Sequence, residues 1–570
     1  LRWLFVIFTA FSLFPVFGYI FSGFSNVNNR WGYIYVVIVS FILAESLDKM
    51  RDLSGKELGI MTAITGLYGL VNAFSDKLFV PSIYGAFGLL AATLIMLFLL
   101  NSDKITFSKK QFRGIVLGMT ALVIFLNAKW FITSGDDSYT HLDTYVSAGD
   151  SKKKISGTAL KHLDEVPGAD TDEFYRSTNL VTTGNLRSSS LLYGYNDVST
   201  FSSTLNGGIV NYNNAMGNCR WNIVSIYDYN FRTYLNTLAS VKYMGVAKKN
   251  TATIPYGYKK VQETKNKYYS IYENQYSLPL GYTYDKIVNA DRIDQYSAAE
   301  KQETTMLAAI VEDKDMDKNS NLTVATKLPL TAQKLKIKNI KLNGVSMTKD
   351  TIEIEKPGAT MKFSFEAPAN AETYLSLVGD IYAEKDAKEH FITARIKAPG
   401  VKYGHKFRID AYTTGQKEYL FNLGYREGAV KTCTLKFVGT GTLKYKDLAI
   451  YSQTMSNYAD RVNALKENSL KNAKAEKNTV TGNITVDKDK MLVVTLPYQK
   501  GWTAYVDGKK TDIQRVNYQY IGINLKKGTH DIKLHYQLPG IKLAFMITGC
   551  GIIAFVAIII FNIVRKRRKN

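Results

Sequence analysis

The chain has 570 residues and a formal net charge of +23 at pH 7. This length predicts more than one domain. No nucleic-acid recognition motif is present, so the positive charge favours an anionic membrane or cell-wall polymer as the partner over nucleic acid. The three cysteines, Cys219, Cys433 and Cys550, form neither a disulfide framework nor a metal-ligand pattern, although a Cys219–Cys433 bridge stays open.

Apolar segments dominate the start of the chain. Each is close to the length that an α-helix needs to cross a bilayer, about 20 residues. No signal-peptide cleavage pattern follows the first segment, so either the chain uses a non-standard start or it is the later part of a longer protein. We therefore predict a membrane domain of five helices in residues 1–132, at Trp3–Phe21, Trp31–Leu47, Leu58–Phe74, Phe79–Leu100 and Phe112–Ile132.

A further apolar run, Ile541–Val564, lies near the C-terminus and is followed at once by the basic residues Arg565–Lys569. Basic residues flank membrane helices on the cytoplasmic side, so this pattern predicts a cytoplasmic C-terminus. The basic loops 48–57 and 101–111 give the same orientation. We therefore predict a multi-pass protein of the cell membrane, with both termini cytoplasmic and residues 133–538 extracytoplasmic.

The extracytoplasmic region is large enough for two or three domains. Residues 133–312 mix strand-like and helical pieces, which predicts an α/β domain. Residues 322–455 alternate in short strands with turn signals, which favours a β-sandwich of jelly-roll type. In residues 456–538 we predict an amphipathic helix and a small β module, and in residues 539–570 a C-terminal transmembrane helix with a basic cytoplasmic tail.

The small β module has the clearest local pattern. Trp502 to Val506 alternates as a strand does, and Trp502 is expected to fill its buried face. Asp507-Gly508 predicts a tight hairpin turn, because both residues of such a turn need a positive φ. Tyr520–Leu525 and Asp531–Leu538 indicate two more strands.

One outer loop is a candidate substrate-binding site. Arg30 and Trp31 stand at the start of the second apolar segment, and Asn26 and Asn29 precede them. A guanidinium at that depth can hold a lipid phosphate bidentately, and the amides can hydrogen-bond sugar hydroxyls. In the alternative interpretation, Arg30 extends to lipid headgroups and Trp31 belongs to the interfacial aromatic belt. Both interpretations use ordinary interfacial behaviour, so the sequence of this loop favours neither over the other.

A second polar cluster is a weaker candidate. Asp136, Asp137, His141 and Asp143 follow the fifth apolar segment and could position a metal or act as a base. A hydrated loop leaving the membrane is the favoured interpretation, because carboxylates are common at such places. No hydrolase, nucleotide or zinc motif is present, so we predict no metal site and name no catalytic residue.

An ordered series of short motifs resembles the YfhO-like multi-pass membrane proteins of Gram-positive bacteria. The resemblance extends over essentially the whole chain, and its specificity lies in the order of the motifs. The series is Gly23-Phe24-Ser25-Asn26, Arg30-Trp31, Phe174-Tyr175-Arg176, Val241-Lys242-Tyr243, Tyr272-Glu273-Asn274, Leu278-Pro279-Leu280-Gly281, Pro497-Tyr498, Gly501-Trp502, Val506-Asp507-Gly508, Gly528-x-His530, Tyr536 and Pro539-Gly540.

The resemblance implies a fold class. The family is similar to the GT-C superfamily of glycosyltransferases, and its members carry further membrane helices before the part that this chain matches. The expected fold is an α-helical multi-pass membrane domain plus a large extracytoplasmic α/β and β-sandwich (jelly-roll-like) region. It would be GT-C-like and N-terminally truncated.

The resemblance also implies an activity. Such enzymes transfer a sugar from a polyprenyl-phosphate carrier to a cell-wall polymer such as teichoic acid on the outer face of the membrane. A carboxylate base would deprotonate the acceptor hydroxyl, and cationic groups would stabilise the leaving phosphate. In GT-C enzymes the catalytic aspartate usually lies on a first outer loop that this chain lacks, so the base is expected outside it.

The implied donor substrate is a polyprenyl-phosphate-linked sugar, and no cofactor is predicted with certainty. The expected partners are membrane lipids, this donor and an anionic cell-wall polymer. A second hypothesis stays open, in which the chain is a non-catalytic membrane-anchored binding or scaffold protein for the anionic wall polymer.

Overall fold

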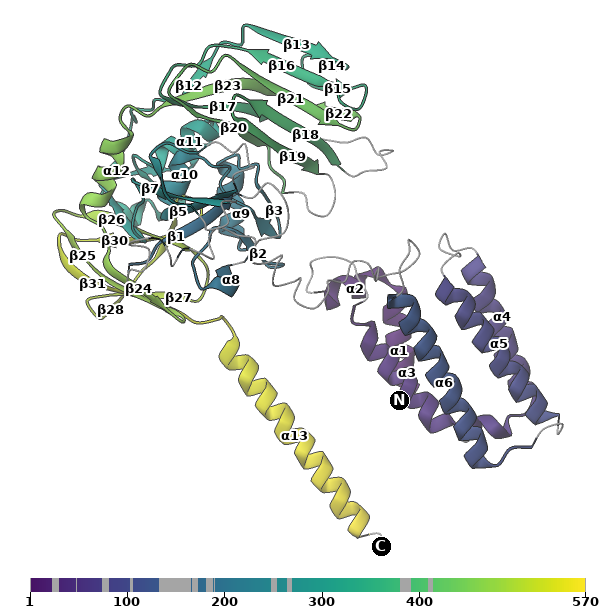
Figure 1. Cartoon of the computed structure of the whole chain (residues 1–570). Helices are drawn as coiled ribbons and strands as arrows, with labels where there is room; N and C mark the ends of the chain where they lie inside the picture. The colour runs from purple at the N-terminus through teal and green to yellow at the C-terminus, as the bar shows by residue number, and fades with distance from the viewer. Residues whose placement is uncertain are drawn as a thin grey trace. The chain divides into compact units, whose positions relative to one another are not determined.

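The computed structural model of the chain is shown in Figure 1. The chain divides into two compact units, Leu1–Lys152 and Lys153–Asn570, and each is described separately below. The structure describes residues 2–22, 30–47, 49–73, 81–102, 106–132, 163, 166, 173–180, 188, 190–247, 254–263, 269–379, 391–408 and 414–568.

The described residues of the first unit form helices. Pro15 opens α2 and cannot continue the hydrogen-bond ladder of α1, and the two helices meet at a bend of 100°. Leu58, Leu97 and Phe112 bring three later helices together in a small apolar core. The helices are α1 (Arg2–Leu13), α2 (Pro15–Phe21), α3 (Gly32–Ser46), the 3₁₀ helix η1 (Lys49–Asp52), α4 (Gly55–Ala73), α5 (Pro81–Asn101) and α6 (Lys109–Ile132).

The predicted fold class, with a multi-pass α-helical membrane domain of GT-C type, is wrong. Within the described residues one helix, α13 (Ile541–Arg567), is long and apolar enough to cross a membrane by itself, and a second span exists only if the bent pair α1–α2 is counted as one. Apolar length in the sequence is not helix length: Pro15 divides the first segment, and α3 has 15 residues. The chain is instead rich in β-sheet.

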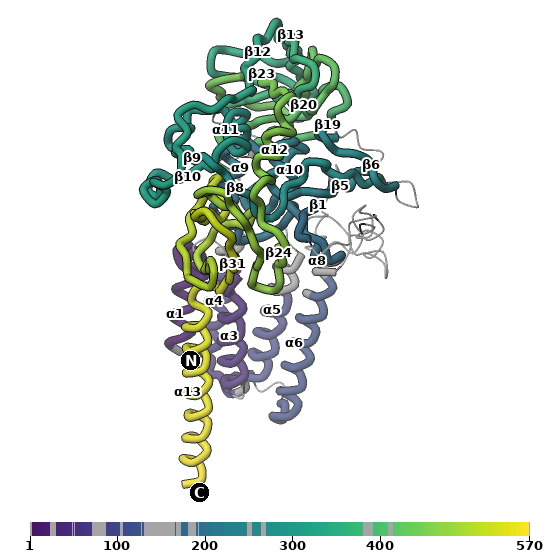
Figure 2. Tube along the Cα trace, turned by 90° about the vertical axis from the view of Figure 1, so that its left-hand side faces the viewer, coloured from purple at the N-terminus to yellow at the C-terminus, as the bar shows by residue number. Residues whose placement is uncertain are grey.

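The second unit begins with a four-stranded sheet that carries three of the motifs. β1 pairs with β5 in parallel, which requires a long crossover between them. Figure 2 labels three strands of this sheet, β1, β5 and β6. In sheet order the strands are β1 (Arg176–Leu180), β5 (Val241–Ala247), β7 (Tyr269–Asn274) and β6 (Tyr258–Glu263). The crossover holds α8 (Ser190–Tyr193), β2 (Thr200–Phe201), α9 (Gly207–Ala215), β3 (Trp221–Asn222), β4 (Ser225–Ile226) and α10 (Thr233–Leu238).

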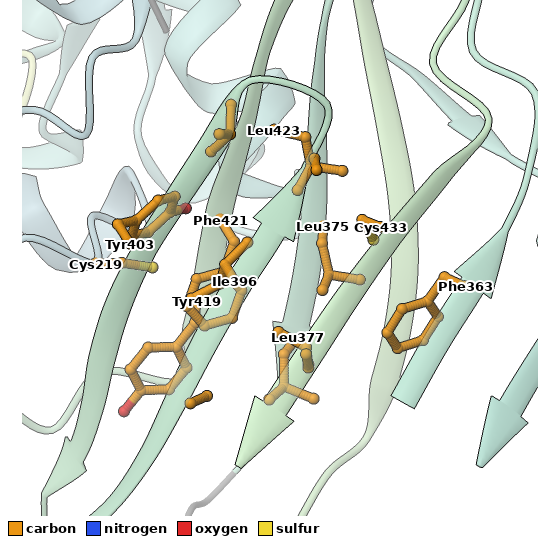
Figure 3. Packing of buried hydrophobic residues seen from close by; sticks show 14 of the residues in the cluster. Cys219, Phe363, Leu375, Leu377, Ile396, Tyr403, Tyr419, Phe421, Leu423 and Cys433 are labelled. Carbon is orange, nitrogen blue, oxygen red and sulfur yellow. The ribbon is translucent and has the colours of Figure 1, made fainter. Parts of the chain in front are cut away.

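A β-sandwich-like domain follows, as its alternating short strands predict. Its core includes Phe363, Leu375 and Phe421, all fully buried (Figure 3). Cys219 and Cys433 lie in the same core as free thiols, so they form no bridge. One sheet has the order β12 (Gln333–Leu335), β23 (Asp447–Thr454), β17 (Ala371–Val378), β20 (Glu418–Arg426). The second has the order β13 (Asn339–Asn343), β16 (Thr360–Ser364), β21 (Thr432–Val438), β18 (Phe391–Ala398), β19 (Val401–Arg408), and the third β14 (Val345–Met347), β15 (Thr351–Ile354), β22 (Gly441–Lys444).

Two more sheets pack face to face through apolar residues such as Val494, Ile521, Ile484 and Leu534. The larger sheet joins the last strands of the chain to strands from residues 281–324. Its order is β11 (Thr323–Val324), β9 (Lys286–Asn289), β10 (Ala309–Val311), β29 (Gln514–Val516), β30 (Tyr520–Leu525), β26 (Lys490–Pro497), β8 (Gly281–Tyr284). The smaller one, here called the terminal sheet, has the order β24 (Lys471–Glu476), β25 (Thr479–Val486), β31 (Gly528–Tyr536), β27 (Trp502–Val506), β28 (Lys509–Thr511).

The predicted hairpin at Asp507-Gly508 is confirmed. Val506 pairs with Lys509, which leaves a loop of these two residues, and their φ angles are 52° and 76°. Trp502 lies on the core face of β27, as the alternation predicts, but it is only half-buried. The tryptophan therefore closes the edge of this core and does not fill its centre.

Two helices lie between strands of the β-rich region, and a third follows its last strand. The predicted amphipathic helix is confirmed as α12 (Tyr458–Glu467), with Tyr458, Val462 and Leu465 buried and β8 beside it (Figure 2). The short helix α11 (Ala298–Thr304) has a capping box at its start. At the other end, α13 follows the left-handed residue Gly540 and carries three basic residues in its last turn.

Candidate functional site

The residues that the sequence singled out lie in the first unit. Arg30 is exposed directly before α3, and Trp31 is the N-cap residue of α3 and only 6% exposed. The Trp31 ring lies 6.0 Å from that of Phe8 and 5.1 Å from that of Phe21, so an aromatic cluster encloses the indole. Asn26 and Asn29 lie outside the described residues, and so do Asp136, Asp137, His141 and Asp143.

In the second unit, four motifs of the ordered series meet in one hollow, which we call the motif cleft. It has a cavity volume of about 570 Å³. Its walls come from the segment just before β1, from β5, from the end of β7 with the loop into β8, and from the end of α12 through the start of β24. The lining residues are Glu173, Phe174, Tyr175, Lys242, Glu273, Asn274, Gln275, Ser277, Leu278, Pro279, Leu280, Lys466, Ser469, Leu470, Lys471, Asn472 and Ala473.

A lysine above two aromatic rings forms one wall of the motif cleft. The ammonium group of Lys242 lies 5.4 Å from the ring centre of Tyr175 and 5.2 Å from that of Tyr243, within cation–π range. Among the described residues it forms an ion pair with the carboxylate of Glu273, at 4.0 Å. Glu273 also accepts a hydrogen bond from the amide of Gln275 at 3.4 Å. Because the ion pair is long and both side chains are partly exposed, Lys242 keeps the capacity to bind an anion.

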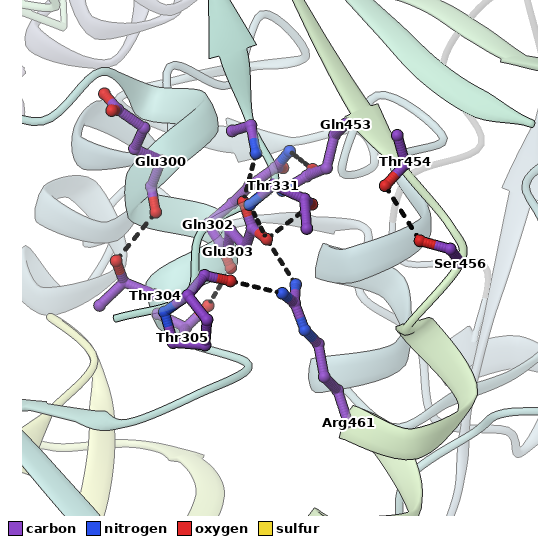
Figure 4. Close-up of polar contacts among 12 residues, drawn as sticks. Glu300, Gln302, Glu303, Thr304, Thr305, Thr331, Gln453, Thr454, Ser456 and Arg461 are labelled. Atoms are coloured by element: carbon purple, nitrogen blue, oxygen red, sulfur yellow. Dashed lines mark hydrogen bonds and ion pairs between the residues drawn. The ribbon is translucent and has the colours of Figure 1, made fainter. Parts of the chain in front are cut away.

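A buried ion pair fixes the helix that supplies the opposite wall. Glu303 on α11 is fully buried, and its carboxylate pairs with Arg461 on α12 (Figure 4). The same carboxylate accepts hydrogen bonds from the backbone N–H of Thr331 at 2.6 Å and of Ala332 at 2.7 Å. Lys466 stands one turn further along α12 and lines the cleft. Partial burial lowers the pKa of Lys466, so an anionic ligand would favour its charged form.

Other motif residues hold the walls of the cleft together through hydrogen bonds to the protein. Arg176 donates to the backbone oxygen of Ala239 at 3.0 Å and to that of Thr495 at 2.7 Å, which ties β1 to β26. Asn274 is 3% exposed and donates to Thr237 and to the backbone oxygen of Val241. The series therefore contains two kinds of residue, those that position the walls and those that present polar groups.

The cleft suits a ligand that carries both hydroxyls and negative charge. Three lysines and two glutamates line it, together with amides, two serine hydroxyls and the rings of Phe174 and Tyr175. Aromatic rings pack against the apolar faces of sugars, and the amides and carboxylates pair with hydroxyls. Within the part of the chain that the structure describes, no group of three or more His, Cys, Asp or Glu residues could hold a metal ion.

Sequence reasoning missed this site because it treated these motifs as strands. Lys242 and Glu273 are thirty-odd residues apart in sequence, and β-sheet pairing between β5 and β7 brings them together. The available signal was chemical. The series contains a lysine, a glutamate and several aromatic residues that an ordinary strand does not require.

The second unit thus combines a β-rich region that carries a polar, lysine-bearing cleft with an apolar C-terminal helix that ends in basic residues. This combination is typical of a membrane protein with a large polar part. The chain belongs to the bacterial membrane protein YfhO family, whose model matches residues 2–548. The predicted family is thereby confirmed, and the chain is a membrane protein.

Among curated proteins, the chain is similar to protein YfhO of Bacillus subtilis (strain 168), with 26% identity over 592 residues. The alignment covers 99% of this chain and 63% of the relative, so the chain spans less than two thirds of the length of the relative.

Among solved structures, it is similar to the arabinofuranosyltransferase AftD from Mycobacteria, with 9% identity, a TM-score of 0.21 and coverage of 78% of this chain and 52% of that one. It is also similar to the C-terminal CBM6 of LamC from Zobellia galactanivorans, with 10% identity and a TM-score of 0.17. This match covers 22% of this chain and 99% of that one. TM-scores this low do not establish a shared fold.

Proposed function

We propose that this chain is part of a membrane glycosyltransferase. In the proposal, the whole protein transfers a sugar from a polyprenyl-phosphate carrier to a cell-wall polymer such as teichoic acid on the outer face of the membrane. The observation that carries the proposal is the meeting of four motifs of the ordered series in the motif cleft, within the residues that the family model matches. The cleft would bind the acceptor polymer, while the donor reacts at groups supplied elsewhere in the protein.

The charges of the cleft support an acceptor with phosphate or carboxylate groups. Lys242, Lys466 and Lys471 line it, and an anion at any of them would gain a charge-assisted hydrogen bond. The ring of Tyr175 gives a flat apolar surface beside Lys242. An extended, hydroxylated polyanion satisfies both features at once.

The basic residues at the end of α13 support an orientation. Arg565, Lys566 and Arg567 form its last turn, and such residues stay on the cytoplasmic side. Residues 133–538 would then be extracytoplasmic, where a wall polymer is available. A cysteine at the exposed position Lys349 should react with an impermeant thiol reagent in intact cells. Labelling only after lysis would contradict the orientation.

The activity test is sugar incorporation into wall polymer by cells that express the full-length protein. We expect Lys242→Ala to raise the KM for acceptor roughly tenfold to a hundredfold, the value of one charge-assisted hydrogen bond. Lys260→Ala is the matched control, because Lys260 lies in the same sheet but pairs with Glu263 at 3.3 Å outside the cleft. Equal effects of the two variants would refute the role of the cleft.

Arg30 enters the proposal as the group that binds the leaving phosphate of the donor. Its exposure before α3 supports contact with a ligand, whereas the burial of Trp31 supports a packing role for the indole. Loss of such a contact costs about 3 kcal/mol, or roughly a hundredfold in rate. Arg30→Lys should be impaired along with Arg30→Ala, since lysine lacks the planar fork. Full activity of Arg30→Lys would indicate that the arginine only reaches to headgroups.

The second candidate is a non-catalytic, membrane-anchored binding protein for the same polymer. The observation that favours it is the presence of three lysines in the lining of the cleft, which can bind an anionic polymer whether or not a reaction follows. Polymer binding that depends on Lys242, together with sugar incorporation that is unchanged when the gene is deleted, would select this candidate over the transferase.

A further inference from the structure

A row of exposed side chains crosses the outer face of the terminal sheet. The pairing register places Lys474 opposite Thr481, Thr481 opposite Lys533, Lys533 opposite Tyr505, and Tyr505 opposite Lys510. Residues that are directly opposite in neighbouring strands share one face of a sheet. Three lysines, one hydroxyl and one aromatic ring therefore stand side by side across all five strands.

The centre of this face is hollow. The hollow has a cavity volume of about 590 Å³ and is lined by Asn472, Thr481, Gly482, Asn483, Tyr505, Gly508, Asp531, Ile532 and Lys533. Its amides, hydroxyl and carboxylate can pair with ligand hydroxyls, and Tyr505 offers a half-exposed ring. A flat bilayer surface would leave such a hollow unfilled, whereas a polyol or sugar unit fits into it.

The charge of this face is not neutralised by the protein. Lys474, Lys510 and Lys533 are exposed, and none of them forms an ion pair with any residue that the structure describes. Asp531 is the acidic residue of the hollow. The face therefore carries a net positive charge that an anionic ligand can neutralise.

The hollow borders the motif cleft at one residue. Asn472 lines both, at a bulge of β24 where its φ is 52°. A smaller hollow of about 270 Å³ runs along the same strand and shares Phe174 and Ala473 with the motif cleft. Residues of the edge strand β24 thus line all three hollows, and Asn472, at the bulge, lines both the motif cleft and the hollow of the terminal sheet.

We propose that the outer face of the terminal sheet is a second binding site for the same polymer chain, which passes from the motif cleft around Asn472 to Tyr505 and Lys533. The ligand class is a linear polyanion of hydroxylated units, long enough to occupy both sites at once. This inference rests on the proposed function in one respect, because it takes the motif cleft as the first contact of the chain. Two linked contacts raise affinity through effective concentration, so binding should depend on polymer length.

The test uses the full-length chain purified in detergent and two probes, synthetic glycerol phosphate oligomers of about two and about twelve units. We expect the longer probe to bind at least about tenfold more tightly than the shorter one. Lys510→Ala and Lys533→Ala should each remove a large part of this advantage and leave the binding of the short probe unchanged. Lys242→Ala should weaken both probes.

The chain provides a matched control in the neighbouring residue. Lys509 has the same charge and exposure as Lys510 but alternates to the other face of β28. Equal weakening by Lys509→Ala and Lys510→Ala would overturn the proposal in favour of general electrostatic attraction, and so would equal affinity for the two probes. Displacement of the long probe by phosphatidylglycerol vesicles, but not by phosphatidylcholine vesicles, would overturn it in favour of a lipid surface. If Lys242→Ala leaves the binding of both probes unchanged while Lys510→Ala and Lys533→Ala weaken binding of the long probe, the motif cleft is not a binding site. The outer face of the terminal sheet then remains one.

Discussion

Removing the guanidinium of Arg461 should destabilise the second unit by about 3 kcal/mol. Arg461 is 8% exposed and Glu303 is 0% exposed, so the substitution Arg461→Ala leaves a buried carboxylate without its counter-ion. Breaking a buried ion pair in this way costs about 3–5 kcal/mol. The N–H groups of Thr331 and Ala332 still donate to the carboxylate, which places the expected cost at the low end of that range.

Urea unfolding of the full-length chain in detergent, followed by near-ultraviolet circular dichroism, measures this cost. With slopes of about 1–3 kcal/mol per molar urea, the midpoint should fall by roughly 1 M or more. A double variant, Glu303→Gln with Arg461→Met, should be less destabilised than Arg461→Ala, because it leaves no buried charge.

An exposed ion pair provides the comparison. Lys338 and Glu366 approach to 2.5 Å, as closely as the buried pair, but their side chains are 59% and 62% exposed. Exposed pairs contribute about 0–1 kcal/mol, so Lys338→Ala should hardly move the midpoint. If Arg461→Ala and Lys338→Ala shift it equally, the argument from burial is refuted.

Three further predictions concern the terminal sheet. Trp502→Ala should lower the free energy of unfolding in urea by about 1.5–3 kcal/mol, less than the roughly 3–5 kcal/mol usual for a fully buried aromatic residue. Thr503→Ala, on the outer face, should lower it by under about 0.5 kcal/mol. Gly501→Ala should destabilise by about 1–3 kcal/mol, since φ is +110° and a Cβ would lie 2.4 Å from a backbone oxygen; an unchanged midpoint would exclude this strain. Partial burial of His530 disfavours its charged form, but the hydrogen bond between His530 and Asp507, at 2.8 Å, outweighs this effect and raises the pKa of His530 above 6.5. The same hydrogen bond lowers the pKa of Asp507 below 3.8. The pair should therefore stabilise the fold fully between about pH 4 and 6.5, and this contribution should be lost as the pH rises through the folded-state pKa of His530. In urea unfolding, His530→Gln should be more destabilising at pH 5.5 than at pH 8.5.

Local patterns in the sequence determined local structure. The alternation of Trp502 to Val506, the turn at Asp507-Gly508 and the strand Tyr520–Leu525 all appear in the structure as predicted. The helical spacing of Tyr458, Val462 and Leu465 likewise gives α12. Each of these depends on backbone preferences and side-chain periodicity within about ten residues, which a single sequence displays directly.

Tertiary structure decided which strands pair and where the cleft forms. Nothing local in residues 490–497 indicates that β26 pairs with β8, and nothing local in residues 514–516 indicates that β29 pairs with β10. Sheet partners are selected by the packing of distant apolar faces. The count of membrane spans failed for a related reason. Apolar composition measures how well a segment is solvated by lipid, whereas a span also needs an unbroken helix, and Pro15 interrupts the first one. The sequence thus contained every residue of the motif cleft, but only pairing across β1, β5 and β7 places Tyr175, Lys242 and Glu273 around one volume.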